Sequence, residues 1–187
     1  TQDRYGLSWQ LMLSEEPNIP ENYRQKLTPC LLYSGAVCGK TEEAVRFYTD
    51  VFKGGTVDLL SHYQEGEAQL PQAKINFAGF TLNGMKFAAM DNGYPADFGF
   101  NEAFSLMIYC DNQNQIDYYW NALSAVPEAE QCGWLKDKYG VSWQVTPTLL
   151  DDIMYHGTSE EARRVTQAFL PMKKIDIKAI ETAVRGK

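Results

Sequence analysis

Residues 131–147 read QCGWLKDKYGVSWQVTP, and this stretch decides the fold more clearly than any other part of the chain. Two strand-like runs, around Trp134 and around Trp143, flank a glycine-containing turn. In the second run apolar and polar side chains alternate, which is typical of a strand with one buried face. We expect the face that carries Trp143 to lie under helices, and the face that carries Ser142 and Gln144 to point into a cavity.

A second copy of this stretch stands near the start of the chain. Residues 3–12 read DRYGLSWQLM and residues 137–146 read DKYGVSWQVT, with six of ten positions identical at an offset of 134 residues. The offset is the size of a whole domain, so two homologous modules in tandem explain the repeat better than chance does. We predict four segments: the last strand of a preceding module at 1–13, a proline-containing linker at 14–26, a complete module at 27–150 and a tail at 151–187.

Within the complete module a layout of strand, helix and hairpin strands occurs twice. In both predicted helices the apolar residues recur at helical spacing, and Asn83-Gly84 is a strong signal for a hairpin turn. The first copy consists of LTPCLLYSG, the helix TEEAVRFYTDVF and the strand candidates TVDLLSHY, KINFAGFTL and MKFAAMD. The second copy consists of AFSLMIYCD, the helix NQNQIDYYWNAL and the strand candidates QCGWLKD and VSWQVTP.

The tail has a helical pattern. Thr158 and Glu161 form a capping box ahead of EARRVTQAFL, and Pro171 should end or kink that helix. A last short helix follows, capped by Asp176 and ending near Gly186.

The composition excludes several classes of function. Apolar residues make up 44% and charged residues 22% of the chain, as in an ordinary globular protein. A net charge of −7 without a basic stripe argues against binding to nucleic acids and to anionic membranes. There is no signal-peptide pattern, no apolar run near the roughly 20 residues of a membrane span, and no Cys-x-x-Cys pair. We therefore expect a soluble cytoplasmic protein with free thiols.

These motifs resemble the PhnB-like family, often labelled demethylubiquinone methyltransferase, of the vicinal oxygen chelate (glyoxalase–bleomycin resistance) superfamily. The matching stretches are PCLLYSG, EEAVRFYTDVF, FTLNGMKFAAMDNG, FGFNEAFSLMIYCD, QIDYYWNAL, QCGWLKDKYGVSWQVTP and FLPMKKIDIKAIETA. The resemblance implies an α+β fold in which two βαβββ units form a curved half-barrel mixed sheet (glyoxalase-like), followed here by a C-terminal helical tail. It also implies a homodimer or a tandem pairing of modules around a small-molecule cavity. No glycine-rich loop follows a first strand to hold S-adenosylmethionine.

The superfamily usually holds a divalent metal with His and Glu side chains, and its last strand commonly resembles D-P-x-G-x-x-x-E. Gln144 stands at the position of that Glu, and a neutral amide is a poor ligand for a hard cation. The first strands of both halves contain neither His nor Glu, and the only histidines are His62 and His156. The sequence therefore supplies no metal site, and no cofactor is predicted.

Several residues are candidates for ligand binding or catalysis, each with an ordinary alternative. Ser142 and Gln144 would bind a ligand by hydrogen bonds, or would satisfy each other and nearby backbone. Trp134 would form the wall of a pocket, or would be a core or interface residue. Cys132 lies on the same strand, but it has no base near it in sequence that would make it a nucleophile.

The remaining candidates lie at strand ends. Ser105, at the start of a central strand, and Asp91, after an apolar strand, are further ligand-binding candidates, although a plain turn role is open for Asp91. Glu102 is the candidate general base, or a solvated loop carboxylate.

Three functions are compatible with the amino-acid sequence. The chain is a metal-free small-molecule binding module, an enzyme of lyase, dioxygenase or transferase type acting on a small oxygenated substrate, or a structural or regulatory domain without ligand. A single module leaves its cavity half open, so we expect a homodimer. The leftover strand at 5–13 should pair with the retained sheet or swap between chains, because Leu7, Trp9 and Leu11 would otherwise be exposed.

Overall fold

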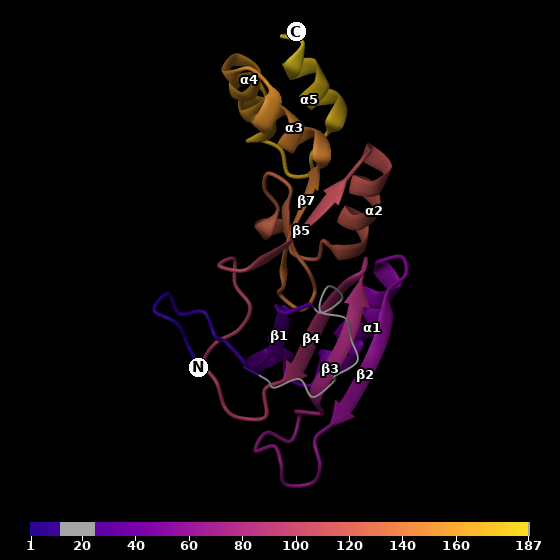
Figure 1. Cartoon of the computed structure of the whole chain (residues 1–187), viewed down its shortest axis with the longest axis vertical. Helices are drawn as coiled ribbons and strands as arrows, with labels where there is room; N and C mark the ends of the chain where they lie inside the picture. Colours follow the sequence, from indigo (N-terminus) through magenta and orange to yellow (C-terminus); the bar gives the residue numbers. More distant parts are fainter. Residues whose placement is uncertain (12–24, 187) are drawn as a thin grey trace.

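The computed structural model describes residues 1–11 and 25–186 (Figure 1). The first sheet lies at one end of the molecule, the helical tail at the other, and the second sheet between them. The predicted linker at 14–26 falls almost entirely outside the described residues. No helix in the described ranges is both long and apolar enough to cross a bilayer.

The first unit has the predicted order of strand, helix and three strands. Its elements are β1 (Cys30–Tyr33), the short 3-10 helix η2 (Gly35–Val37), α1 (Thr41–Val51), β2 (Thr56–His62), β3 (Ile75–Leu82) and β4 (Met85–Asp91). The four strands form one sheet in the order β1-β4-β3-β2, with β1 parallel to β4. Asn83 and Gly84 both have positive φ, as the predicted hairpin turn between β3 and β4 requires.

The second unit has one strand fewer than a twice-used βαβββ plan predicts. Its elements are β5 (Ser105–Cys110), α2 (Gln113–Leu123), the 3-10 helix η3 (Pro127–Ala129), β6 (Trp134–Lys136) and β7 (Ser142–Pro147). The strands form a separate three-stranded sheet in the order β5-β7-β6, with β5 parallel to β7. The short η3, which begins at Pro127, stands in place of a strand equivalent to β2.

Each helix packs the predicted apolar face against the core. Ala44, Val45 and Tyr48 of α1 are fully buried, and Ile116 and Leu123 of α2 are almost fully buried. Because α1 packs on β2, β3 and β4 and α2 on the strands of the second sheet, the opposite face of each sheet is free of these helices.

Asp137 joins the two units. Its Oδ1 accepts hydrogen bonds from the amides of Tyr139 and Val141 (2.9 and 3.0 Å), and its Oδ2 accepts from Trp143 Nε1 (2.8 Å) and from the hydroxyl of Tyr48 (2.7 Å). The carboxyl group is only 1% exposed. Burial raises the pKa of Asp137, while the four donated hydrogen bonds act in the opposite direction. Since Tyr48 belongs to α1, this carboxyl group links the two halves of the module.

The tail folds back on the second unit. It consists of α3 (Thr148–His156), which was not predicted, α4 (Ser159–Phe169) and α5 (Ile177–Val184). The predicted capping box of Thr158 and Glu161 is present, and Asp176 caps α5. Gln113 of α2 clamps the start of α5, because its side-chain amide donates to the carbonyl of Ile175 (3.1 Å) and accepts from the amide of Ile177 (2.9 Å).

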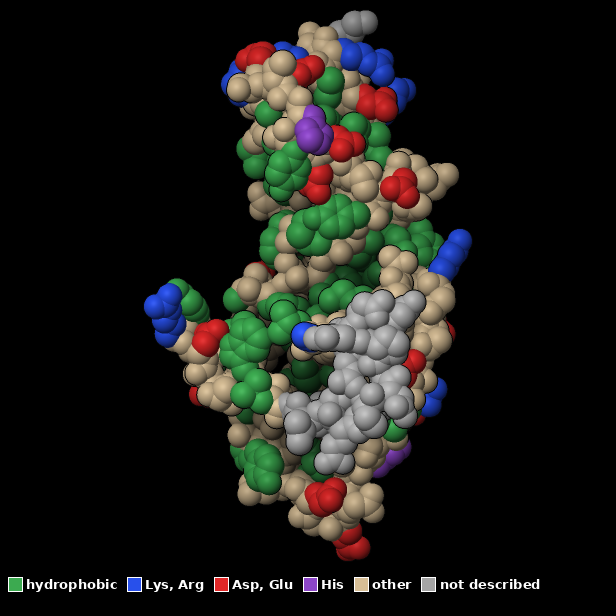
Figure 2. Space-filling model, viewed as in Figure 1, with side chains coloured by type: hydrophobic (Ala, Val, Ile, Leu, Met, Phe, Trp, Pro, Cys, Tyr) green, Lys and Arg blue, Asp and Glu red, His purple; other side chains and the backbone are tan. Residues whose placement is uncertain are grey.

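Residues 1–11 do not join either sheet as a strand within the described part of the chain. They form a turn closed by the isolated bridge between Gln2 and Ser8, and the segment projects from the side of the molecule (Figures 1 and 2). Of the two alternatives for residues 5–13, pairing with the retained sheet is not found for the described residues 5–11, and a swap between chains stays a prediction.

Candidate functional site

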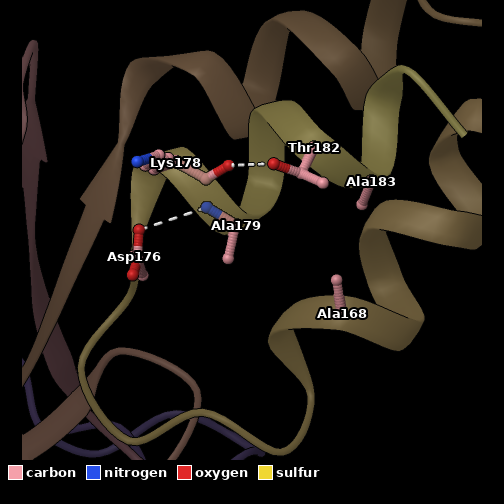
Figure 3. A pocket seen from close by; sticks show the side chains of 6 residues that line it. All are labelled: Ala168, Asp176, Lys178, Ala179, Thr182 and Ala183. Carbon is pink, nitrogen blue, oxygen red and sulfur yellow. Dashed lines mark hydrogen bonds between the residues drawn. The ribbon is translucent and has the colours of Figure 1, made fainter. Parts of the chain in front are cut away.

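A groove of about 460 Å³ lies between α4 and α5 (Figure 3). Small alanine side chains form much of its wall, and the side chains of Asp176 and Thr182 already bond to the helix itself. Asp176 accepts from the amide of Ala179 at the start of α5 (3.1 Å), and the hydroxyl of Thr182 donates to the carbonyl of Lys178 (2.8 Å). Because these polar groups serve as cap and helix contacts, the groove offers little directional chemistry to a ligand.

A second cavity, of about 310 Å³, combines polar and aromatic groups from four elements. It opens beside β6 and β7 and is bounded by α3 and α4. Its lining consists of Cys132, Gly133, Trp134, Gln144, Val145, Thr146, Leu150, Asp151, Met154, Thr166 and Phe169. Three predicted ligand-binding residues, Cys132, Trp134 and Gln144, thus lie around one hollow, which we take as the candidate site.

Gln144 sits on the face of the second sheet that is turned away from α2, as the strand alternation predicts, and α3 and α4 border the cavity on this side. It lies opposite Trp134 of β6 and opposite Met107 of β5. Its Nε2 donates to the hydroxyl of Ser105 (2.8 Å), which brings another predicted residue to the site. Ser105 fixes the orientation of the side-chain amide of Gln144. Among the described residues nothing donates a hydrogen bond to the side-chain oxygen, Oε1, of Gln144.

Ser142 lies on the same face, one pleat before Gln144. Its side chain is 2% exposed, and its hydroxyl has no hydrogen-bond partner among the described residues. An unsatisfied buried polar group costs about 1–3 kcal/mol. Ser142 is not part of the cavity wall. Gln144 bonds to Ser105 rather than to Ser142, which was one of the predicted alternatives.

Cys132 connects the site to the tail. It has a positive φ of 51°, its thiol donates to the carbonyl of Leu170 (2.9 Å), and its amide donates to the carbonyl of Met172 (2.7 Å). The described residues that line the cavity include no His, Lys or Arg that would stabilise a thiolate. The position of Cys132 therefore favours a wall role over a nucleophilic one.

Glu102 lies at the edge of the same sheet rather than in the cavity. It forms an ion pair with Lys136 of β6 (2.5 Å), and the hydrogen bond from Lys136 lowers the pKa of Glu102. A lowered pKa makes a carboxylate a weaker proton acceptor near neutral pH. This environment does not favour Glu102 as a general base.

Asp91 is not brought to the site. It lies fully buried on the helix side of the first sheet, where its Oδ1 accepts from the amides of Gly39 and Thr41 and from the Thr41 hydroxyl. Its Oδ2 accepts from the amides of Lys74 and Ile75 (both 2.9 Å). With five donors from its own chain, Asp91 holds the β1–α1 loop and the start of β3, so we leave it out of the candidate site.

Sequence reasoning missed the part of the site that the tail supplies. The residues concerned are Leu150, Asp151 and Met154 of α3 and Thr166 and Phe169 of α4. Leu150 and Ile153 are spaced as on one face of a helix, which was the available signal for α3. Their place beside β7 depends on how the tail folds back, which no local pattern encodes.

The residues present do not fit the metal site that the superfamily implies. Within the ranges that the structure describes, no three His, Cys, Asp or Glu side chains lie close enough to share an ion. On the strand where the resemblance places a metal-binding Glu, Gln144 offers a neutral amide that is already bonded to Ser105. We therefore derive no chemical step through a metal.

Comparisons with known proteins agree with this architecture. The family model described as 3-demethylubiquinone-9 3-methyltransferase matches residues 25–146. The PhnB protein from Bacillus cereus is 34% identical, with a TM-score of 0.56 over 66% of this chain and 100% of that chain. The protein PA1353 from Pseudomonas aeruginosa is 20% identical, with a TM-score of 0.50 over 66% of this chain and 98% of that chain. A comparison with curated proteins gives no match.

The description of that family implies a methyl donor such as S-adenosylmethionine. The glycine-containing β1–α1 loop is where a doubly wound fold would hold such a cofactor. Here the amides of Gly39 and Thr41 donate to Asp91, so the chain's own carboxylate occupies the start of α1. A Cβ on Gly39 would lie 2.4 Å from the carbonyl oxygen of Gln72, so this glycine packs against its own chain. The loop does not fit the cofactor, and we derive no methyl-transfer step.

Proposed function

Because the chain belongs to the 3-demethylubiquinone-9 3-methyltransferase family, the PhnB-like branch of the glyoxalase superfamily, we propose a function for its cavity in that setting. The chain binds a small organic molecule, uncharged or cationic, in the hollow between β6, β7, α3 and α4. The observation that carries the proposal is the chemistry of the described part of the wall, which unites Trp134 and Gln144 with one charged side chain, Asp151.

The charge of the wall selects the ligand class. Asp151 is a carboxylate in the first turn of α3, and the described residues of the wall include no cation. An anion placed here would meet a like charge without a compensating Lys or Arg. A neutral molecule would meet only dipoles, and a cation would gain attraction from Asp151 and from the face of an aromatic ring such as that of Trp134.

The polar groups orient the ligand. Since Gln144 donates to Ser105, its carbonyl oxygen is left to accept a hydrogen bond from the ligand. Thr146 follows on the same face of β7 and adds a hydroxyl group. Trp134, Leu150 and Met154 would cover the apolar part of the ligand. The proposed ligand is therefore an amphipathic molecule with at least one hydrogen-bond donor.

We place the binding protein in the cytoplasm as a homodimer. Its four cysteines, all in described positions, are free thiols, as a reducing compartment requires. Met107 and Tyr109, on the face of β5 that is turned away from α2, are about half exposed, as is Leu59 on the first sheet. A second copy that covers these faces would remove apolar surface from water.

A thermal-shift screen tests the proposal, with binding confirmed by calorimetry. The panel would contain a quaternary ammonium compound, a neutral phenol and quinone, S-adenosylmethionine and an aromatic carboxylate. A ligand at about 100 times its Kd should raise Tm by roughly 5–10 °C. We expect shifts from the quaternary ammonium compound, the phenol or the quinone, and none from the aromatic carboxylate or from S-adenosylmethionine, which also carries a carboxylate.

Gln144→Leu is the diagnostic variant, and Gln10→Leu is its matched control, because Gln10 occupies the equivalent position in the repeated motif but lies outside the cavity. Loss of one hydrogen bond should weaken binding about tenfold in the first variant and leave it unchanged in the second. Binding that is confined to anions, or that is equally sensitive to both variants, would refute the proposal. A panel that produces no shift at all would favour the structural or regulatory alternative.

A further inference from the structure

The turn at Asp3 is closed by its own side chain. Oδ1 of Asp3 accepts from the amides of Tyr5 (2.9 Å) and Leu7 (3.0 Å), and Oδ2 accepts from Trp9 Nε1 (3.0 Å). The backbone amide of Asp3 donates to the carbonyl of Leu7 (2.9 Å). Gly6 completes the turn with a φ of 88°. The segment thus has a defined local structure although it belongs to neither sheet.

The same local arrangement of hydrogen bonds occurs at Asp137. The carboxylate again accepts from two amides and from an indole, here those of Tyr139, Val141 and Trp143. The backbone amide of Asp137 donates to the carbonyl of Val141 (3.0 Å), and Gly140 has a φ of 89°. The bonds that the Asp3 carboxylate accepts, and the bond from its backbone amide, therefore all have equivalents in the Asp137 turn.

The two turns differ in what covers them. At Asp137 the hydroxyl of Tyr48 donates a fourth hydrogen bond (2.7 Å), and Phe52 stacks on Trp143 with ring centroids 5.6 Å apart. In addition, Lys138 lies over the ring of Phe47 (4.6 Å). All of these covering groups belong to α1 or its C-cap. Helix α1 is therefore the surface on which a turn of this sequence docks.

At Asp3 the equivalent side chains face solvent. Tyr5, Leu7 and Trp9 are 79%, 52% and 38% exposed, whereas Tyr139, Val141 and Trp143 are 4%, 1% and 2% exposed. Among the described residues, Arg4, the counterpart of Lys138, lies over the ring of its neighbour Tyr5 (4.6 Å) and over no ring of a helix. The three side chains of the Asp3 turn are thus exposed, although their counterparts in the Asp137 turn are buried. Among the described residues nothing equivalent to α1 covers the Asp3 turn.

We propose that residues 3–10 form a docking element that completes a second unit of this family. The partner surface is an α1-like helix with a tyrosine at the position of Tyr48 and an aromatic residue at that of Phe52. A carboxylate at the position of Glu43 would face Arg4, as Glu43 faces Lys138 here (3.5 Å). An unaltered second copy does not offer this surface, because its own Tyr48 is bonded to Asp137. The proposal does not depend on ligand binding in the cavity.

A designed tandem chain tests the docking directly. The designed chain begins with an appended unit, a copy of residues 25–136, which contains α1 but not the Asp137 turn. Residues 3–187 follow it directly, so that Asp3 comes after the copy of Lys136. The offset of the repeat then puts Asp3 where the appended unit needs Asp137. Hydrogen exchange, followed by mass spectrometry on a peptide that covers residues 3–11, reports whether the turn becomes buried.

We expect exchange of this peptide to be at least about 100-fold slower in the tandem chain than in the 187-residue chain. Tyr48→Phe in the appended unit removes the hydroxyl that should donate to Asp3, and it should restore much of the fast exchange. The same substitution in the original unit should leave the peptide protected. Equal exchange in both chains, or no difference between the two Tyr48→Phe variants, would overturn the proposal.

A second experiment needs no appended unit. Over eight residues the two turns differ only at two positions, so K138R/V141L converts residues 137–144 into the sequence of residues 3–10. If that sequence fits an α1 surface, the variant folds, and its Tm changes by less than about 8 °C. A variant that fails to fold would show that residues 3–10 do not suit such a surface, which would defeat the proposal whatever the tandem chain does.

Discussion

Removing the carboxyl group of Asp137 should be among the most destabilising single changes in this module. Asp137→Ala takes away the acceptor for the Tyr48 hydroxyl and the Trp143 indole, both of which are buried. A buried donor without an acceptor costs about 1–3 kcal/mol, so these two groups alone give roughly 2–6 kcal/mol. A domain with about 5–15 kcal/mol of total stability would lose a large part of it.

Urea denaturation followed by tryptophan fluorescence measures this loss, provided that the m-value is unchanged. Tyr48→Phe should cost less, because the carboxylate keeps three of its four donors. Asp3→Ala is the control within the chain, because it removes the same carboxylate from an exposed turn and should leave the urea midpoint unchanged. A loss below about 1 kcal/mol for Asp137→Ala would refute the view that Asp137 links the two units.

Three further changes have definite expected outcomes. Gln113→Leu removes both hydrogen bonds that clamp the start of α5, so the tail should become sensitive to limited proteolysis at a loss of about 1–2 kcal/mol. Hydrogen bonds from Lys40 and Tyr139 lower the pKa of Glu43 to about 2, so the stability that this carboxylate contributes should be lost as pH drops from about 4.5 toward 2. A series of urea midpoints measured over this pH range should be flatter for Glu43→Gln than for the unchanged chain. Light scattering should give a dimer at micromolar concentration for the unchanged chain, and a monomer for Tyr109→Glu, which puts a charge on the proposed dimer face. A monomer for the unchanged chain would contradict the homodimer.

Local patterns were sufficient for most elements of the module. The apolar face of α1, from Ala44 to Val51, was predicted from helical spacing, and Asn83-Gly84 correctly indicated the hairpin. These features depend on interactions within a few residues, which a sequence displays directly. Helix α3 was missed because it starts directly after β7, at Thr148, and Pro147 supplies no side-chain cap.

The candidate site was predictable only in part. Strand alternation placed Gln144 on the face opposite Trp143, but its bond to Ser105 follows from the parallel register of β5 and β7, which no local pattern reveals. Asp91 looked like an open turn residue because it ends a strand. Its donors come from residues 39–41 and 74–75, far away in sequence, and they bury it completely.

Strand β7 packs against α1 through one face and lines the cavity with the other, and the alternation of its side chains explains why these two roles occur together. Successive side chains of β7 point to opposite faces, so the residue that anchors the unit, Trp143, is followed by the residue that faces the cavity, Gln144. A copy of the motif therefore carries both tasks together. Residues 3–10 repeat Trp143 as Trp9 and Gln144 as Gln10. If Trp9 docks on an α1-like helix, Gln10 must turn to the opposite face of the sheet in that second unit, where it would present an amide as Gln144 does here.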